Sequence, residues 1–165
     1  MRKFAIVSLL AIVMVAVSLC WFGYSLFHGV TYLGSDGVYL QKSSWDCGDA
    51  ALKMIFDHYG IPVVYDDLLS QLDASAAGTS MLSLKKLSEA KGLHCEGWRL
   101  TFEDLRHAPL PAILILRGSH YVVLDSLTPS GEVLLRDPAR GKLLLSPRKL
   151  KSIWKGEALL FLSPM

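Results

Sequence analysis

Gln41-Lys-Ser-Ser-Trp-Asp-Cys47-Gly-Asp-Ala-Ala-Leu52 places a cysteine at the start of a stretch with helical spacing, shortly after a glutamine. A helix N-terminus stabilises a thiolate, because unpaired backbone N–H groups and the positive end of the helix dipole face the sulfur. We therefore predict that Cys47 is a nucleophile. The side-chain amide of Gln41 could join the backbone N–H of Cys47 in binding a developing oxyanion.

A nucleophilic cysteine requires a histidine as base and a carboxylate or amide that orients the histidine. His120 opens one expected strand, at residues 120–127, and Asp137 closes the next, at residues 132–137. A turn at residues 129–131 would make these strands antiparallel and bring the two side chains to one end of a sheet.

The apolar pattern changes from helical to strand-like after Gly92. Helices are expected at residues 46–59, 65–72 and 79–91, and strands at 94–100, 112–116, 120–127, 132–137, 142–145 and 158–162. Asp46 is expected to cap the first helix, and Asp49 to be an acidic residue of its first turn. Residues 149–155 are expected to form a solvated basic segment. Helices followed by a mostly antiparallel sheet predict an α+β fold.

Gln41, the triplet Asp46-Cys47-Gly48, His120 before an apolar strand, and Asp137-Pro138 followed by Gly141 resemble the double-glycine leader peptidases. This is the bacteriocin-processing branch of the papain-like cysteine peptidases, and the resemblance covers residues 38–162. It implies a papain-like fold without a cofactor. By motif position it implies Cys47 as nucleophile, His120 as base, Asp137 as the orienting group and Gln41 in the oxyanion hole.

Members of this family commonly form the N-terminal domain of an ABC exporter and remove leader peptides after Gly-Gly or Gly-Ala. The resemblance therefore implies a leader-bearing peptide or protein as substrate. Because no exporter sequence follows Leu162, we expect a stand-alone domain whose partner is a separate exporter or an outer-membrane or secretion component.

The N-terminal residues predict a membrane anchor. Arg2 and Lys3 precede an uncharged apolar run from Phe4 to Phe27, and a membrane span needs about 20 residues. The two charges would keep the N-terminus in the cytoplasm and place the domain in the periplasm or on the outer face. We expect an anchor at residues 1–30, a tether at 31–37 and the peptidase domain at 38–165. A cleavable signal peptide is the alternative, and a lipoprotein with its lipid on Cys20 a weaker one.

The net charge of +2 is too small to favour a nucleic-acid partner. The sequence also lacks a basic stripe with interleaved aromatic residues. The histidines also lack metal-ligand spacing with a second cysteine or histidine, so no metal site is expected. Cys95 is expected to be a buried small hydrophobe. A Cys47–Cys95 disulfide is the alternative, which an oxidising compartment would permit.

Two other functions fit parts of the pattern. The domain could be a docking module that holds export substrates without cutting them. It could also use the same acyl-enzyme chemistry for transpeptidation or for hydrolysis of another amide, since only the substrate and the acceptor separate these reactions from proteolysis.

Overall fold

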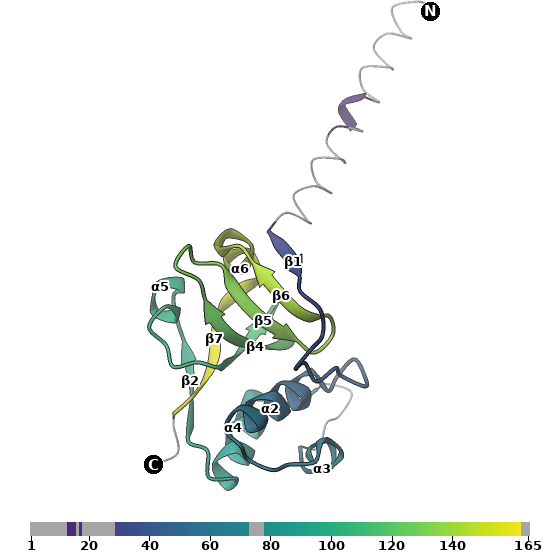
Figure 1. Cartoon of the computed structure of the whole chain (residues 1–165), viewed down its shortest axis with the longest axis vertical. Coiled ribbons are helices and arrows are strands. Elements are labelled where there is room, and N and C mark those ends of the chain that lie inside the picture. Colours follow the sequence, from purple (N-terminus) through teal and green to yellow (C-terminus); the bar gives the residue numbers. More distant parts are fainter. Residues whose placement is uncertain (1–12, 16, 18–28, 73–77, 163–165) are drawn as a thin grey trace, which may run out of the picture.

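The computed structural model describes residues 13–15, 17, 29–72 and 78–162 (Figure 1). Most of the predicted anchor, residues 1–30, lies outside these ranges. Within them, no helix combines the length and the apolar character that crossing a bilayer requires.

From residue 29 onward, the chain begins with one short strand, continues with helices and ends with most of the sheet. The helices are α2 (Cys47–His58), α3 (Tyr65–Gln71), α4 (Met81–Ala90), α5 (Phe102–Leu105) and α6 (Pro147–Ile153). The strands are β1 (Val30–Tyr32), β2 (Cys95–Arg99), β3 (Ala112–Leu116), β4 (His120–Leu127), β5 (Val133–Asp137), β6 (Gly141–Leu145) and β7 (Trp154–Phe161).

The strands form one curved sheet in the order β1-β6-β5-β4-β3-β7-β2, and neighbouring strands are antiparallel. Successive hairpins connect β3 to β4, β4 to β5 and β5 to β6. The predicted α+β class is therefore confirmed, as is the antiparallel pairing of the strands that carry His120 and Asp137.

Each face of the sheet buries its own core, because side chains alternate between the two faces of a strand. Val123 of β4 belongs to the core that α2, α3 and α4 cover, whereas the adjacent Leu124 belongs to a second core closed by α5 and α6. In Figure 1, α2 and α4 lie below the sheet, and α6 lies at the top of the domain, near β6. Burial on both faces explains why β3 and residues 121–124 of β4 are continuously apolar.

Residues 147–153 form helix α6 rather than the solvated segment that the basic residues predicted. The Ser146 hydroxyl accepts a hydrogen bond from the Lys149 N–H at 3.3 Å, and Pro147 occupies the first turn. Leu150 is fully buried in the second core. β7 then begins at Trp154, four residues earlier than predicted, with its indole N–H bonded to the Glu157 carbonyl at 2.9 Å.

The predicted tether is likewise not a plain linker, because Val30–Tyr32 adds strand β1 to the edge of the sheet beside β6.

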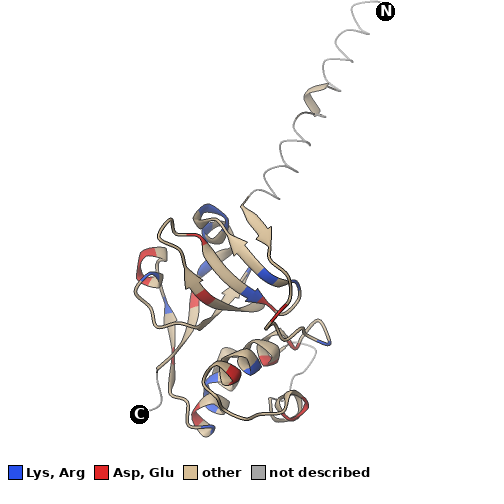
Figure 2. Ribbon diagram, viewed as in Figure 1, with Lys and Arg blue, Asp and Glu red and all other residues tan. Residues whose placement is uncertain are grey.

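Lys and Arg residues are interspersed with Asp and Glu residues over the domain (Figure 2).

Candidate active site

Cys47 is the first residue of α2, as predicted, and is 5% exposed. Its side chain lines a cavity of about 350 Å³ together with Trp45, Thr79 and Tyr121. The next residue, Gly48, lies against the Tyr121 ring, where an added Cβ would come within 3.2 Å of a ring carbon. A glycine at this position therefore lets the mouth of α2 approach β4 closely.

Asp46 precedes the helix, but its carboxylate does not cap it, which corrects the prediction. The carboxylate instead accepts the N–H groups of Lys42 at 2.9 Å and Ser43 at 3.0 Å, and the Tyr65 hydroxyl at 2.9 Å. Asp46 is 1% exposed. Asp46 therefore fixes the loop between Gln41 and Cys47. The local sequence does not indicate its contact with Tyr65, which lies 19 residues further along the chain.

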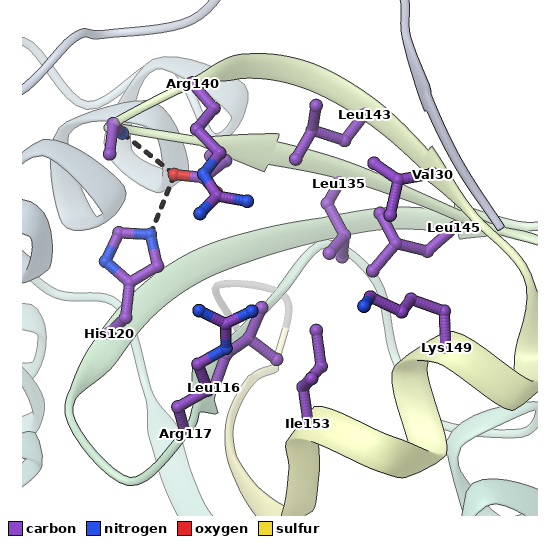
Figure 3. Close-up of a pocket in the computed structure, with 12 residues that line it drawn as sticks. Val30, Leu116, Arg117, His120, Leu135, Arg140, Leu143, Leu145, Lys149 and Ile153 are labelled. Atoms are coloured by element: carbon purple, nitrogen blue, oxygen red, sulfur yellow. Dashed lines mark hydrogen bonds and ion pairs between the residues drawn. The ribbon is translucent and has the colours of Figure 1, made fainter. Parts of the chain in front are cut away.

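His120 and Asp137 meet at one end of the sheet, as the predicted hairpin requires. The His120 Nε2 lies 2.7 Å from the Asp137 Oδ1, which also accepts the Ala139 N–H at 2.8 Å (dashed lines in Figure 3). The Asp137 side chain is 4% exposed and that of His120 is 29% exposed. The carboxylate is thus held by two donors and fixes the orientation of the imidazole ring.

The His120 imidazole interacts with Cys47 as well as with Asp137. Burial lowers the pKa of His120, but hydrogen bonds and charge interactions with Asp137 and Cys47 outweigh it and raise the pKa to about 9. Because Nε2 faces Asp137, Nδ1 is the nitrogen left for the Cys47 sulfur. A pKa of about 9 keeps the His120 imidazole positively charged at neutral pH.

Gln41 is tied to the loop that follows Asp137, since its backbone N–H donates to the Pro138 carbonyl at 2.9 Å. Its side-chain Nε2 donates to the Ser43 carbonyl at 2.5 Å, and its Oε1 is buried without a partner among the described residues. An amide nitrogen carries two hydrogens, so one remains for a ligand. The role of Gln41 in the oxyanion hole stays a prediction.

Asp49 lies in the first turn of α2, as predicted. It is fully buried there, and its Oδ1 accepts the Thr79 hydroxyl at 2.6 Å. Burial raises the pKa of Asp49 to about 6, although the Thr79 hydrogen bond opposes this shift. The Thr79 contact spans 30 residues, so nothing in the local sequence indicates it.

Cys95, the other cysteine among the described residues, does not line the cavity beside Cys47. Cys47 and Cys95 are both free, so the disulfide alternative does not hold in this structure. Cys95 is fully buried, as predicted, and burial raises the pKa of its thiol. In the part of the chain that the structure describes, no cluster of three or more His, Cys, Asp and Glu side chains could hold a metal ion.

The chain is similar in sequence to proteins from several processing systems. It is 32% identical to the probable functional amyloid protease FapD of Pseudomonas aeruginosa, over 70% of this chain and 56% of FapD. It is 33% identical to the colicin V secretion/processing ATP-binding protein CvaB of Escherichia coli, over 72% of this chain but only 17% of CvaB. The chain thus spans about half the length of FapD and less than a fifth of the length of CvaB.

Solved structures share the fold. A double glycine motif protease from an AMS/PCAT transporter, crystallised with the leader peptide, superimposes with a TM-score of 0.72 at 24% identity, covering 84% of this chain and 96% of that protein. The model of the Peptidase C39 family matches residues 36–164 and so includes Gln41, Cys47, His120 and Asp137. The chain therefore belongs to the Peptidase C39 family and is a cysteine peptidase.

Proposed function

We propose that this peptidase cleaves an exported peptide or protein after a Gly-Gly or Gly-Ala pair at the end of an N-terminal leader. The observation that carries the proposal is the convergence of Cys47 at the mouth of α2 with the His120–Asp137 pair. The name of FapD and the leader-bound protease crystallised from a transporter support a secreted substrate with a leader.

The chemistry follows from the site. The Cys47 thiolate attacks the carbonyl carbon of the residue before the scissile bond, and the carbonyl oxygen becomes an oxyanion near the Cys47 N–H and Gln41. His120 gives its proton to the leaving amine as the C–N bond breaks, which leaves a thioester. His120 then takes a proton from water, the resulting hydroxide attacks the thioester, and the released thiolate regains its imidazolium partner.

A small residue before the scissile bond suits the space beside Cys47. Two aromatic side chains, Trp45 and Tyr121, and the Thr79 side chain bound the cavity there. Tyr121 is 7% exposed and packs against α2, so it cannot move aside without opening the core. We expect these fixed walls to favour glycine or alanine over a bulky side chain next to the attacked carbonyl.

The apolar run from Phe4 to Phe27 anchors the peptidase in the cytoplasmic membrane, with the domain in the periplasm or on the outer face. Its length and the flanking Arg2 and Lys3 support this topology. From there the domain meets its substrate as it leaves a separate exporter or pore.

A synthetic 30-residue leader peptide with an internal Gly-Gly and a ten-residue extension tests the proposal. Mass spectrometry should find cleavage directly after Gly-Gly, with one water added across the products. A Leu replacing the second Gly should slow cleavage by at least about a hundredfold. A transpeptidase would instead join the leader to an added amine, and a docking module would bind the peptide and release it intact.

A further inference from the structure

A second cavity is lined by His120 but not by Cys47, and the cavity beside Cys47 is not lined by His120. The second cavity encloses about 180 Å³ at the open end of the second core, between the sheet and α6. Its walls are mostly apolar and include Leu116, Leu135, Leu143 and Ile153. His120 and Asp137 also line it, so it opens directly beside the catalytic pair.

Two arginines, Arg117 and Arg140, line the mouth of this cavity. Figure 3 shows both guanidinium groups directed into the space between them, next to the His120 ring. Both residues are exposed, and neither guanidinium has an ion pair or a hydrogen bond with any residue that the structure describes. Arg136, in contrast, holds the Asp125 carboxylate at 2.7 Å.

The backbone of Arg117 is held in an unfavourable conformation. Its φ of 53° is in the left-handed region, which residues with a side chain rarely adopt. Its N–H donates to the Ile153 carbonyl at 2.7 Å, and this bond links the β3–β4 turn to the end of α6. The left-handed conformation belongs to the tight turn between β3 and β4, and this turn holds Arg117 at the rim of the cavity.

The direction of the substrate follows from the proton transfer. The acyl carbon bonds to Cys47, whose cavity lies on the Trp45 and Thr79 side. The leaving amine must contact His120, because His120 protonates it. A substrate chain that passes from Cys47 to His120 and continues in the same direction reaches the cavity between Arg117 and Arg140.

We infer that this cavity is a specificity site for the first residues after the scissile bond, and that it takes an acidic side chain followed by an apolar one. Arg117 and Arg140 would bind the carboxylate with charge-assisted hydrogen bonds, and the leucine-rich wall would take the apolar side chain. The inference rests on the proposed function, since it assumes that Cys47 cleaves a peptide bond.

The test compares two leader peptides that differ only after Gly-Gly, one continuing with Glu-Leu and the other with Gln-Leu. The wild-type enzyme should cleave the Glu-Leu peptide with a kcat/KM about tenfold higher than the Gln-Leu peptide, mainly through a lower KM. High salt should reduce this difference. The double variant Arg117→Gln/Arg140→Gln should reduce this preference to below about twofold. Arg148→Gln, an exposed arginine of α6 outside the cavity, should keep it.

The outcomes separate this inference from the proposed function. Equal cleavage of the two peptides by the wild-type enzyme overturns the specificity site and leaves the peptidase proposal intact. Cleavage of neither peptide contradicts the peptidase proposal, and binding then decides the specificity site. In that case Cys47→Ala should bind the fluorescently labelled Glu-Leu peptide about tenfold more tightly than the Gln-Leu peptide, and the two arginine substitutions should abolish the difference. Equal affinities overturn the inference.

Discussion

At the scale of single residues, the protonation of His120 controls the proposed reaction. The imidazole must be charged to stabilise the Cys47 thiolate and to give a proton to the leaving amine. Burial works against the charged form, while Asp137 and Cys47 favour it strongly enough to raise the pKa of His120 to about 9. Asp137 is therefore both an orienting group and a source of negative charge.

Asp137→Asn should lower the pKa of His120, because it removes the neighbouring charge but can retain a hydrogen bond. The wild-type kcat/KM should fall as pH rises through about 9, and in Asp137→Asn this alkaline decline should move to lower pH. NMR titration of His120 and a pH profile of cleavage check this. Asp137→Asn should also retain more activity than His120→Ala, which removes the base. An unchanged His120 pKa would contradict the assigned role.

Gln41→Ala separates oxyanion binding from activation of the thiol. Alkylation of Cys47 by iodoacetamide forms no oxyanion, so its rate should hardly change. Peptide cleavage should fall by about a hundredfold if the Gln41 amide stabilises the intermediate. The informative quantity is the ratio of the two rates in the variant. If both rates fall together, Gln41 supports the loop before α2 and does not bind the oxyanion.

At the scale of elements, the pieces that carry the site could be predicted from sequence. The helix after Cys47 and the strands bearing His120 and Asp137 have strong local patterns and turn signals, so their type and pairing were predicted correctly. The short helix α6 was missed, because its basic residues hide the single buried Leu150 that anchors it. Contacts between distant segments, such as Thr79 with Asp49, have no local signal at all.

The buried Asp49 ties α2 to the segment before α4 and makes stability depend on pH. Its folded-state pKa of about 6 exceeds the ordinary 3.8, so its contribution favours folding most below pH 3.8 and is lost as pH rises through 6. The difference in the free energy of unfolding between Asp49→Asn and the wild type should therefore shift in favour of Asp49→Asn as the pH rises from 4 to 8. The shift should be up to about 3 kcal/mol. Urea denaturation at both pH values measures this. The exposed control Asp36→Asn should show no such change, and a gain for Asp49→Asn that is equal at both pH values would refute the assignment.

At the scale of the whole molecule, the proposal depends on where the domain resides. β1 begins at Val30, so the chain enters the sheet within three residues of the apolar run that ends at Phe27. A domain joined this closely to an anchor would remain near the membrane surface, where a substrate emerges from an exporter. This placement remains a prediction from the sequence of the N-terminus.

A reporter fused after Met165 tests the topology. Alkaline phosphatase, which requires an oxidising compartment to form its disulfides, should be active in this fusion, and the fusion should remain with the membrane after carbonate extraction. A soluble active fusion whose N-terminus lies near Val30 would replace the anchor with a cleaved signal peptide. An inactive fusion would place the domain in the cytoplasm.

The central claim is that Cys47 attacks the carbonyl of the last glycine of a double-glycine leader. A leader peptide ending in a Gly-Gly chloromethyl ketone tests this claim most directly. Such a label reacts fastest with a nucleophile that the bound leader places next to the ketone. Peptide mapping by mass spectrometry should find the label on Cys47 and not on the buried Cys95, and labelling should be slowed at least about a hundredfold in His120→Ala. Labelling of Cys95 at a similar rate, or no labelling of Cys47 by a leader peptide that the protein binds, would contradict the account.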